Sequence, residues 1–540
     1  MKTRLLPILP VLISLFGCSL FPSPHTKDAD YVVHHGRLEV HRKDQSRYKT
    51  PLAPVQKNAS SAMGASSSAR TTALSVPSLV PERYADIQYP AFHYVAPYPK
   101  DYRVEISDSI TGYLVPDRSL PFIRMNVYFR ESTLPGAPNQ VASLSLLSVM
   151  YRRGGSTHLS AEQLDDSLEL LAAGIGGDLG DFNSSLALNC LSRDFPATLA
   201  LLEDVFTHPA FDSSRLELQK NVYLQNLQHK YDRPSDLLSG LSRWAMYQSS
   251  PRLWNAQPAE VKRVKRADLL KLAPGHFAPR RVIFALSGDF DRDSMATTLK
   301  AFFDRWPKPT GTAQASQQLA FKNKPGIYVV DKDVTQANIS MEQPFVRRPH
   351  PDYYAASVAS YILGGGGFTS RLTLRIRSDE GLAYSVRSFA ESDYDDVGSA
   401  GIRLQTKVSS AAYAIQLALQ EVNKLAESGP TPEELEGAKA ALIESLPGIF
   451  DSPANTASAF ARSEVWGRSF DHFKDYPAKI RAVTAADVQR CIRTYFDPKK
   501  MTISIVGPVA GLEAPDYDHR ISLSDLGKIR VVPMDSLELR

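Results

Sequence analysis

The fold is decided by a stretch that reads Asp268-Leu-Leu-Lys-Leu-Ala-Pro-Gly-His-Phe-Ala-Pro279 and leads into Val282-Ile-Phe-Ala-Leu-Ser-Gly288. It recurs as Asp487-Val-Gln-Arg-Cys-Ile-Arg-Thr-Tyr-Phe-Asp-Pro498, which leads into Met501-Thr-Ile-Ser-Ile-Val-Gly507. Six pairs of identical residues share one offset of 219 residues: Asp268/Asp487, Phe277/Phe496, Pro279/Pro498, Gly288/Gly507, Pro234/Pro453 and Val264/Val483. The repeat predicts two homologous halves, at residues 101–307 and 323–510.

Each half mixes the two-residue period of a strand with the spacing of a helix. Alternation predicts strands at 122–129, 185–191 and 400–407, and helical spacing predicts helices at 197–206, 215–230 and 411–426. A further helix should start at Thr431-Pro432, an N-cap followed by an N1 proline. The pattern predicts an α+β fold of two homologous sandwich domains, each an antiparallel-rich sheet with helices packed on one face. Residues 308–322 would link the halves, and 511–540 would form a C-terminal tail.

The N-terminus has the features of an export signal. Lys2 and Arg4 precede an apolar run, residues 5–16, that is too short to span a bilayer and is typical of a signal peptide. The run ends at Gly17-Cys18-Ser19, which resembles a bacterial lipobox, although Phe16 departs from that pattern. Residues 1–18 are therefore expected to be a lipoprotein signal peptide. Cys18 would be acylated, and the protein would be anchored on the periplasmic face of the outer membrane. The alternative is an ordinary secretory leader with an incidental cysteine.

Residues 19–100 have the composition of a disordered or extended tether. The segment 51–80 is rich in Ser, Ala and Pro and poor in apolar side chains that could form a core. His34, His35 and His41 lie close together and could ligate a metal. Without a Cys or carboxylate at ligand spacing, a solvated polar tail is the favoured interpretation.

The composition excludes several classes of protein. The chain has 540 residues, 43% of them hydrophobic, and a formal net charge of +4. That length predicts two to four domains, and the small charge gives no indication of a nucleic-acid surface. Three cysteines are too few for a disulfide scaffold or a four-Cys zinc site. Cys190 and Cys491 fall at apolar positions, where buried free thiols are expected.

The strongest local motif is a glycine run in the second half. It reads Leu363-Gly364-Gly365-Gly366-Gly367-Phe368-Thr369-Ser370-Arg371-Leu372 and continues through Arg377 to Gly381-Leu-Ala-Tyr384. A phosphate cradle is excluded because the Gly-Lys-Ser/Thr ending is missing. The segment closely resembles the C-terminal-half signature of the insulinase/pitrilysin family of zinc metallopeptidases. The resemblance covers about 400 residues and implies two α+β halves that close like a clamshell around extended peptides.

The resemblance gives a role to two residues of this segment. In the family, an Arg and a Tyr seven positions later project towards the substrate, and Arg377 and Tyr384 match that pair. A guanidinium and a phenol can hydrogen-bond a peptide carbonyl or a developing oxyanion. Gly364, Gly365, Gly366 and Gly367 would support the pair. The structural alternative is a solvated helix residue at 377 and a half-buried strand residue at 384.

The zinc site that the family carries is missing from this sequence. An inverted zincin motif, His-x-x-Glu-His, would supply two ligands and a general base, but no His-x-x-x-His pair occurs among the 12 histidines. The family spacing places Ser145 and Val149 at the histidines, Ser148 at the base and Asn226 at the third ligand. Gln219 stands at a further acidic position. His158, His208, His229 and His276 are interpreted as surface or loop histidines, because none has the context of another hydrolytic site.

The sequence therefore predicts a catalytically inactive member of this family. It would bind no metal itself, and zinc is expected only on a partner subunit. The leading hypothesis is a hetero-oligomer with a zinc-bearing homologue, in which this chain binds extended peptides and supplies Arg377 and Tyr384 to a shared proteolytic chamber. The first alternative is a stand-alone peptide-binding or scaffold subunit. An active zinc metalloendopeptidase is least favoured, because all three ligands and the base are replaced.

Overall fold

The computed structural model describes residues 29–34, 37–42, 93–130, 133–274, 276–277, 280–308, 318–322, 324–516 and 518–538. The chain divides into two units, Met1–Tyr89 and Pro90–Arg540. In the first unit, strands β1 (Ala29–His34) and β2 (Arg37–Arg42) pair antiparallel, with Tyr31 opposite Val40 and Val33 opposite Leu38. The composition predicts a tether here and gives no indication of this hairpin, because the apolar residues alternate over a few positions only. Cys18 lies outside the described residues.

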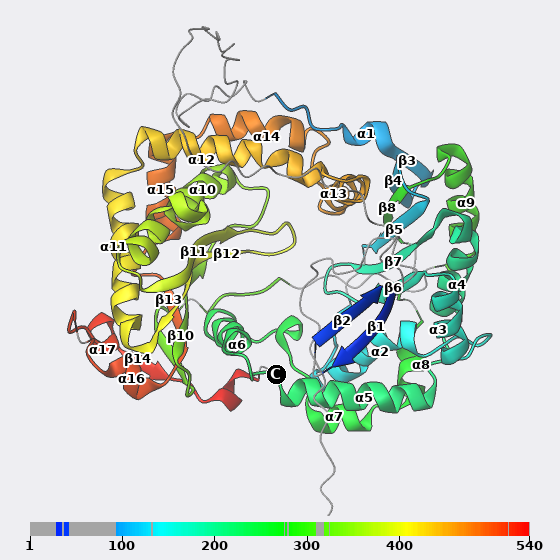
Figure 1. The fold of residues 1–540 in the computed structure, drawn as a ribbon, viewed down its shortest axis with the longest axis horizontal. Helices are drawn as coiled ribbons and strands as arrows, with labels where there is room; N and C mark the ends of the chain where they lie inside the picture. The colour runs from blue at the N-terminus through cyan, green and yellow to red at the C-terminus, as the bar shows by residue number, and fades with distance from the viewer. Residues whose placement is uncertain are drawn as a thin grey trace, which may run out of the picture. The chain divides into compact units, whose positions relative to one another are not determined.

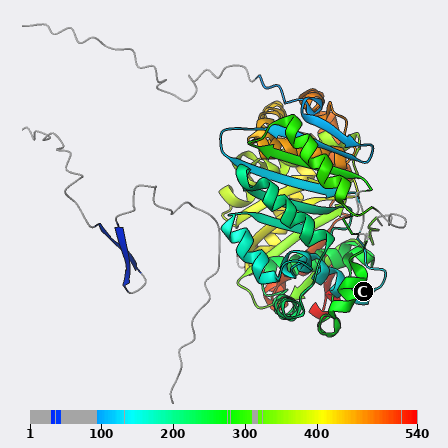
Figure 2. The ribbon, with the colours of Figure 1, turned by 90° about the vertical axis from the view of Figure 1, so that its right-hand side faces the viewer.

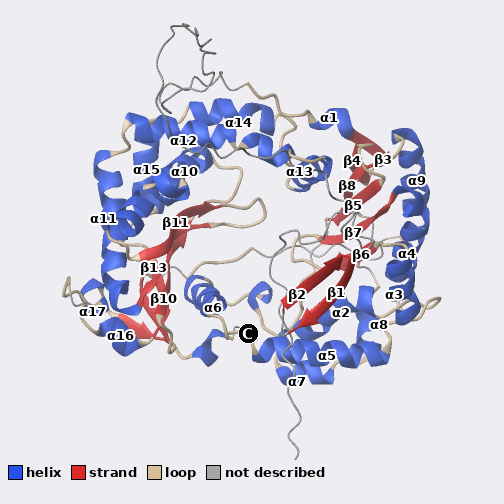
Figure 3. Ribbon diagram, in the orientation of Figure 1, coloured by secondary structure: helices blue, strands red, loops and turns tan. Residues whose placement is uncertain are grey.

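The second unit contains two six-stranded sheets (Figures 1 and 3). The first sheet has the order β3-β4-β8-β5-β7-β6, and its strands are β3 (Arg103–Ser107), β4 (Ile110–Pro116), β5 (Phe122–Phe129), β6 (Gly174–Asp178), β7 (Ser184–Leu191) and β8 (Val282–Gly288). The second has the order β11-β12-β10-β13-β9-β14, and its strands are β9 (Gly326–Asp331), β10 (Gln336–Pro344), β11 (Ala383–Glu391), β12 (Ser399–Lys407), β13 (Thr502–Gly507) and β14 (Ile529–Val531).

Five strands of each sheet repeat one topology, and the sixth differs, because β3 pairs antiparallel with β4 whereas β14 pairs parallel with β9. The parallel pair β4–β8 in the first sheet corresponds to the parallel pair β9–β13 in the second. The antiparallel run β8-β5-β7-β6 likewise corresponds to β13-β10-β12-β11. The repeated stretches of the sequence therefore form equivalent central strands, β8 and β13, and the predicted α+β fold of two homologous halves is confirmed.

Helices cover one face of each sheet. In the first half α2 (Val141–Arg153), α4 (Phe195–Thr207) and α9 (Arg292–Arg305) contact its strands. The other helices on this side are α3 (Ala161–Leu170), α5 (Ser213–Gln228), α7 (Pro258–Arg263) and α8 (Arg266–Leu272), of which α5 and α8 pack on α2 and α7 packs on α5. Figure 2 views this half from its outer side, with helices in front of the strands. In the second half they include α10 (Asp352–Ser360), α11 (Ala411–Ser428), α12 (Pro432–Glu444), α14 (His472–Arg481) and α15 (Ala485–Tyr495). Cys190 and Cys491 are buried, free thiols. Within the described residues, no helix combines the length and apolarity needed to cross a bilayer.

The other face of each sheet is covered by a helix from the opposite half. Helix α13 (Pro453–Val465) packs Phe460 against Tyr113 and Ile283 of the first sheet. Helix α6 (Pro234–Met246) packs Leu237 and Leu241 against the second sheet, where they meet Tyr328, Val330 and Val506. The two helices begin at the repeated prolines of the 219-residue offset. Strands β8, β9 and β13 are consequently buried on both faces.

The contact of α13 with the first sheet includes a half-buried carboxylate. Glu464 accepts hydrogen bonds from Arg103 Nε (3.0 Å), Arg103 Nη2 (2.9 Å), Thr111 Oγ1 (2.9 Å) and Tyr113 Oη (2.6 Å). Burial alone would raise the pKa of Glu464, but the hydrogen bonds from Arg103, Tyr113 and Thr111 outweigh it and lower the pKa below its ordinary value. The ionised carboxylate therefore joins the two halves.

Glu464→Gln should destabilise the chain by about 2 kcal/mol at pH 7, because it removes the charged acceptor of three hydrogen-bonding side chains, although Glu105 still pairs with Arg103. A carboxylate whose pKa is lower in the folded than in the unfolded state stabilises the fold at pH values above its unfolded pKa. This contribution is lost as the pH falls through the folded pKa. The difference between variant and wild type should therefore shrink in acid, as measured by urea unfolding between pH 7 and 3. Asp304→Asn, which removes the exposed partner of Lys300, is the control and should cost less than about 1 kcal/mol. A loss of stability in Glu464→Gln as small as that of the control would contradict the stabilising role of the Glu464 carboxylate.

Residues 511–516 and 518–538 are part of the fold, which corrects the expectation of a tail over this range. Strand β14 pairs parallel with β9 at the edge of the second sheet. Leu523 and Leu537 are buried, at 0% and 2% exposure. The sequence gives little indication of this, because the segment has one three-residue strand and isolated apolar positions rather than a periodic run.

Candidate functional site

The glycine run forms a tight connection between α10 and β11. The chain leaves α10 through a π-helical turn, Tyr361–Gly365, passes a short 3-10 turn, Gly367–Thr369, and enters a second π-helical segment, Thr373–Asp379. Gly364 packs directly on β11, since a Cβ at this position would lie 2.4 Å from the amide nitrogen of Ser388. Gly367 has a φ of +60°, which favours glycine. Gly365 and Gly366 lie between these two positions in the same connection.

Arg377 lies between two exposed aromatic rings. Its Cζ is 4.5 Å from the centroid of the Phe368 ring and 4.5 Å from that of the Tyr384 ring. Phe368 is 67% and Tyr384 83% exposed. Two cation–π contacts fix the guanidinium while its edge remains available to a ligand. Arg377 and Tyr384 are predicted from the sequence, whereas Phe368 is not, because the only signal it gives is an apolar residue next to the glycine run.

The neighbouring arginines of this segment have carboxylate partners. Arg371 makes two hydrogen bonds of 2.6 Å with Glu434, and Arg375 pairs with Glu380. Within the described residues, no carboxylate pairs with Arg377, and the Tyr384 hydroxyl has no hydrogen-bond partner. Arg377 and Tyr384 are therefore the members of the motif whose donors remain for a ligand.

Tyr384 occupies a bulge in the edge strand β11. Ala383 pairs with Thr406, whereas Ser385 pairs with the next residue, Gln405, so Tyr384 is the extra residue between them. A β-bulge redirects a side chain and is often found beside functional sites. It explains why Tyr384 is exposed in a strand whose alternate residues, such as Val386, are buried.

The loop that joins β11 to β12 is fixed to the first half. Arg130 Nη1 is 3.0 Å from Asp395 Oδ1, and Arg252 pairs with both Asp181 (3.1 Å) and Asp396. The Asp396 carboxylate also accepts a hydrogen bond of 3.0 Å from the amide of Leu319. These contacts, which we call the inter-half clasp, tie the strand that carries Tyr384 to the first half.

The positions expected for zinc lie on two helices that touch. The hydroxyl of Tyr223 on α5 donates a 3.2 Å hydrogen bond to Ser145 Oγ on α2. Ser148 Oγ donates to Asp178 (3.2 Å) and accepts from the Leu179 amide (3.1 Å), which joins α2 to the end of β6. Val149 is 44% exposed, and Asn226 and Gln219 lie on α5, the first exposed and the second half-buried.

These residues do not fit a zinc ion. Zinc in proteins is held by Cys, His and carboxylate groups. The five positions offer two hydroxyls, two amides and one valine instead, so neither a metal-bound water nor a general base is provided here. We derive no hydrolytic step from this chain alone.

Strand β6 is the free edge of the first sheet beside these positions. It is the last strand in the sheet order, and it reads Gly-Ile-Gly-Gly-Asp. In the part of the chain that the structure describes, no atom lies within 4 Å of a Cβ built at Gly176. An edge strand with unpaired backbone groups and few side chains can accept an extended peptide as an additional strand.

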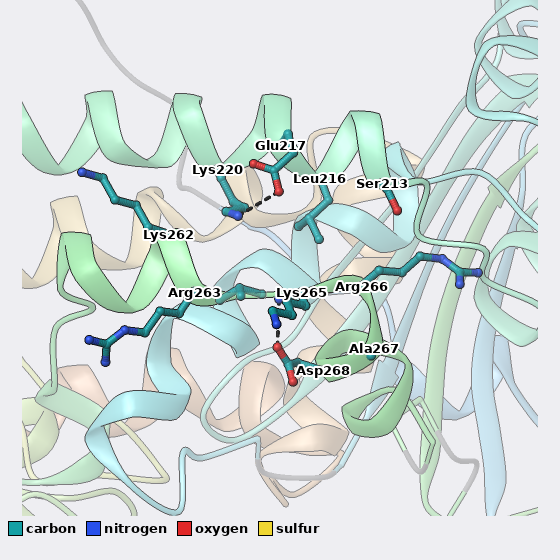
Figure 4. A pocket seen from close by; sticks show the side chains of 11 residues that line it. Ser213, Leu216, Glu217, Lys220, Lys262, Arg263, Lys265, Arg266, Ala267 and Asp268 are labelled. Carbon is teal, nitrogen blue, oxygen red and sulfur yellow. Dashed lines mark hydrogen bonds and ion pairs between the residues drawn. The ribbon is translucent and has the colours of Figure 1, made fainter.

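A separate basic hollow of about 810 Å³ lies between α5 and the α7–α8 segment (Figure 4). Its cationic side chains are Lys220, Lys262, Arg263, Lys265 and Arg266. Lys220 pairs with Glu217 at 2.8 Å, while Arg263 and Arg266 point away from each other. The hollow contains none of the residues predicted from the sequence, so it is not the candidate site.

Comparison with known proteins supports the interpretation of the glycine segment. The family described as the Peptidase M16 inactive domain matches residues 263–442. This range includes Gly364, Arg377 and Tyr384 but none of the positions expected for zinc.

Relatives match over most of the chain. The non-peptidase homologue YmxG of Helicobacter pylori is 27% identical over 393 residues, which are 72% of this chain and 89% of that protein. An uncharacterized zinc protease of Streptomyces coelicolor is 22% identical over 355 residues, which are 63% and 76% of the two chains.

Solved structures share the fold. A peptidase M16 inactive domain from Pseudomonas fluorescens has a TM-score of 0.64 and 24% identity, and the match covers 74% of this chain and 95% of that one. The periplasmic protease PqqL from Escherichia coli has a TM-score of 0.63 and 15% identity, with 79% and 49% covered.

The repeated sheets and the glycine connection define a two-half α+β fold, which the solved M16 structures share. The chain is similar to inactive, insulinase-like members of the M16 peptidase family, and it lacks the His-x-x-Glu-His motif.

Proposed function

We propose that this chain is the non-catalytic subunit of a two-subunit peptidase and that its partner is a zinc-bearing homologue. The partner would contribute the metal and the base, and this chain would contribute Arg377 and Tyr384 to a shared proteolytic chamber. The observation that carries the proposal is the contrast between the two sites. The Arg377–Tyr384 pair is positioned and has unused donors, whereas all positions expected for zinc have lost their ligands.

The pair would act through hydrogen bonds to a peptide in the chamber. The guanidinium of Arg377, held between two rings, and the hydroxyl of Tyr384, turned outward by the bulge, are both donors. Such donors hold a peptide carbonyl and stabilise the negative charge that develops on its oxygen. The edge of β6 would hold the extended peptide through backbone hydrogen bonds.

A stand-alone peptide-binding or scaffold subunit is the second candidate. It is favoured by the rings around Arg377, because two cation–π contacts give this side chain a role in the fold without any substrate. The two candidates differ in whether a catalytic partner exists.

Association with a partner tests the proposal. Homologues with an intact His-x-x-Glu-His motif from the same genome should be co-expressed with this chain and purified through a tag on either one. A stable complex that hydrolyses unstructured peptides faster than the homologue alone is expected. If none of these homologues associates, the two-subunit proposal fails and the scaffold candidate stands.

We also propose that the protein is exported and anchored by an acyl group on Cys18, at the periplasmic face of the outer membrane. One protein of related fold, PqqL from Escherichia coli, is a periplasmic protease. Several acyl chains anchor stably, because each buried methylene contributes about 0.8 kcal/mol.

Cys18→Ala should move the protein from the membrane fraction to the soluble periplasmic fraction or leave its leader uncleaved. Fractionation and labelling with a radioactive fatty acid would measure both effects, and Ser19→Ala serves as the neighbouring control. Unchanged membrane partitioning together with unchanged labelling would refute the anchor.

A further inference from the structure

Two histidines and one aspartate meet where the turn after α2 touches the end of α4. His158 Nδ1 is 2.6 Å and His208 Nδ1 is 3.6 Å from Asp204 Oδ1. One ligand atom from each of the three residues lies within 4.8 Å of the others. The two imidazole rings stand edge to face, with centroids 5.2 Å apart. Ligands around a single metal ion have separations of this order, since each bond to the metal is about 2.0–2.2 Å long.

The backbone fixes the cluster before any ligand binds. Asp204 and His208 are four residues apart at the end of α4, where the His208 amide donates to the Asp204 carbonyl at 2.8 Å. The Thr157 amide donates to the His208 carbonyl at 2.8 Å and holds the turn of His158 against this end. Ser156 Oγ accepts from the His158 amide at 3.1 Å and donates to Asp204 Oδ2. The three side chains therefore converge without help from a metal.

The electrostatics of the cluster favour a cation. Negative partial charge accumulates at the carboxyl end of a helix, where Asp204 and His208 lie. Within the described residues, no Lys or Arg pairs with Asp204, whereas the adjacent Glu203 is paired with Arg305 at 2.6 Å. Asp204 is 19% exposed, and the His158 and His208 side chains are 64% and 56% exposed, so an ion can reach all three from solvent.

We propose that His158, Asp204 and His208 bind one divalent transition-metal ion. Two imidazoles and one carboxylate suit Zn²⁺, Ni²⁺, Cu²⁺ or Co²⁺, whereas Ca²⁺ and Mg²⁺ require oxygen ligands. The site is separate from the degenerate zinc positions, which lie earlier on α2 and on α5. A bound ion would join the turn after α2 to the end of α4 and keep coordination positions open to solvent. The inference does not depend on the proposed function.

The site can be tested on the full-length chain, purified without a histidine tag and stripped of metal. His34, His35 and His41 are replaced by Ala in all samples, because these histidines could bind metal themselves. Zn²⁺ titration by calorimetry should show about one site per chain. His158→Ala and His208→Ala should each weaken binding at least about tenfold, since loss of outer partners alone costs 10- to 100-fold. Added Co²⁺ should give a visible absorption band that both variants lose.

His229→Ala is the matched control. His229 is also exposed and also contacts an aspartate, Asp232, at 2.7 Å, but among the described residues no second histidine joins that pair. Zn²⁺ affinity should therefore be unchanged in this variant. Urea midpoints without metal show whether the variants remain folded, which their exposure leads us to expect. Equal Zn²⁺ affinity in the wild type and the His158→Ala/His208→Ala double variant, no Zn²⁺ binding at all, or Ca²⁺ binding as tight as Zn²⁺ binding would each overturn the proposal.

Discussion

Arg377→Ala and Tyr384→Phe are each expected to slow peptide hydrolysis by the reconstituted complex about 10²–10³-fold, which is the usual cost of losing one donor to a developing oxyanion. Phe retains the ring that contacts the Arg377 guanidinium and removes only the hydroxyl. The Tyr384→Phe variant therefore separates chemistry from packing. Turnover should fall in both variants while the amount of complex, measured by size-exclusion chromatography, stays the same.

A matched control is available on the same strand. Arg387 is exposed on β11 and, within the described residues, makes no ion pair. Arg387→Ala removes the same charge three residues from Tyr384 and should change turnover less than about threefold, as surface charges usually contribute little. If Arg377→Ala and Tyr384→Phe hydrolyse peptides at the wild-type rate in an intact complex, the pair is structural. If the complex with Arg387→Ala hydrolyses peptides as slowly as that with Arg377→Ala, the loss of rate comes from the change in net charge and not from the position of Arg377.

Restoring the zinc motif should give the chain a metal site that it lacks. The combination Ser145→His, Ser148→Glu, Val149→His and Asn226→Glu recreates the two histidines, the base and the third ligand. Positions 145 and 149 are one helical turn apart and share a face of α2. Asn226 is one turn beyond Tyr223, whose hydroxyl already contacts Ser145 across the two helices. About one tightly bound Zn²⁺ per chain is expected, because three ligands of the usual type then converge.

Other histidines could bind zinc and obscure the result. The restored motif is therefore introduced into a chain in which His158, His208, His34, His35 and His41 are all replaced by Ala. The parent chain in this background should contain no stoichiometric zinc and cleave no peptide. A version that keeps Ser148 should bind zinc but remain inactive, because it has no general base. Elemental analysis and chelator-sensitive hydrolysis measure the two properties. Failure of the restored motif to bind zinc would show that the assignment of these positions is wrong.

The sequence predicts elements whose pattern is local and repeated. Strands β8 and β13, the helix that starts after Thr431 and the connection around Gly364 all follow from period, caps and glycines. The packing of α6 and α13 on the sheet of the opposite half could not be predicted. Apolar residues such as Leu237 and Phe460 indicate burial but do not indicate which sheet they contact.

The same limit applies to the sites. The bulge at Tyr384 depends on its register with β12, which no single strand reveals. The four-residue spacing of Asp204 and His208 is visible in the sequence, but His158 is distant along the chain and joins them only through the paired turns. The Arg377–Tyr384 pair was predicted because one short segment contains both residues. The cluster of His158, Asp204 and His208 was not predicted because only the fold brings its members together.

Helices α6 and α13, each packed on the sheet of the opposite half, limit how the molecule can open and how it unfolds. Separating the halves would expose Tyr113 and Ile283 on one sheet and Tyr328 and Val330 on the other, together with the helix faces that cover them. Neither half is then a self-sufficient cooperative unit, and the two should melt in one transition. Peptides would have to enter through local opening of loops, such as the one held by the inter-half clasp. In evolution, a change on either helix has to be tolerated by the sheet of the other repeat, so the two copies cannot diverge independently.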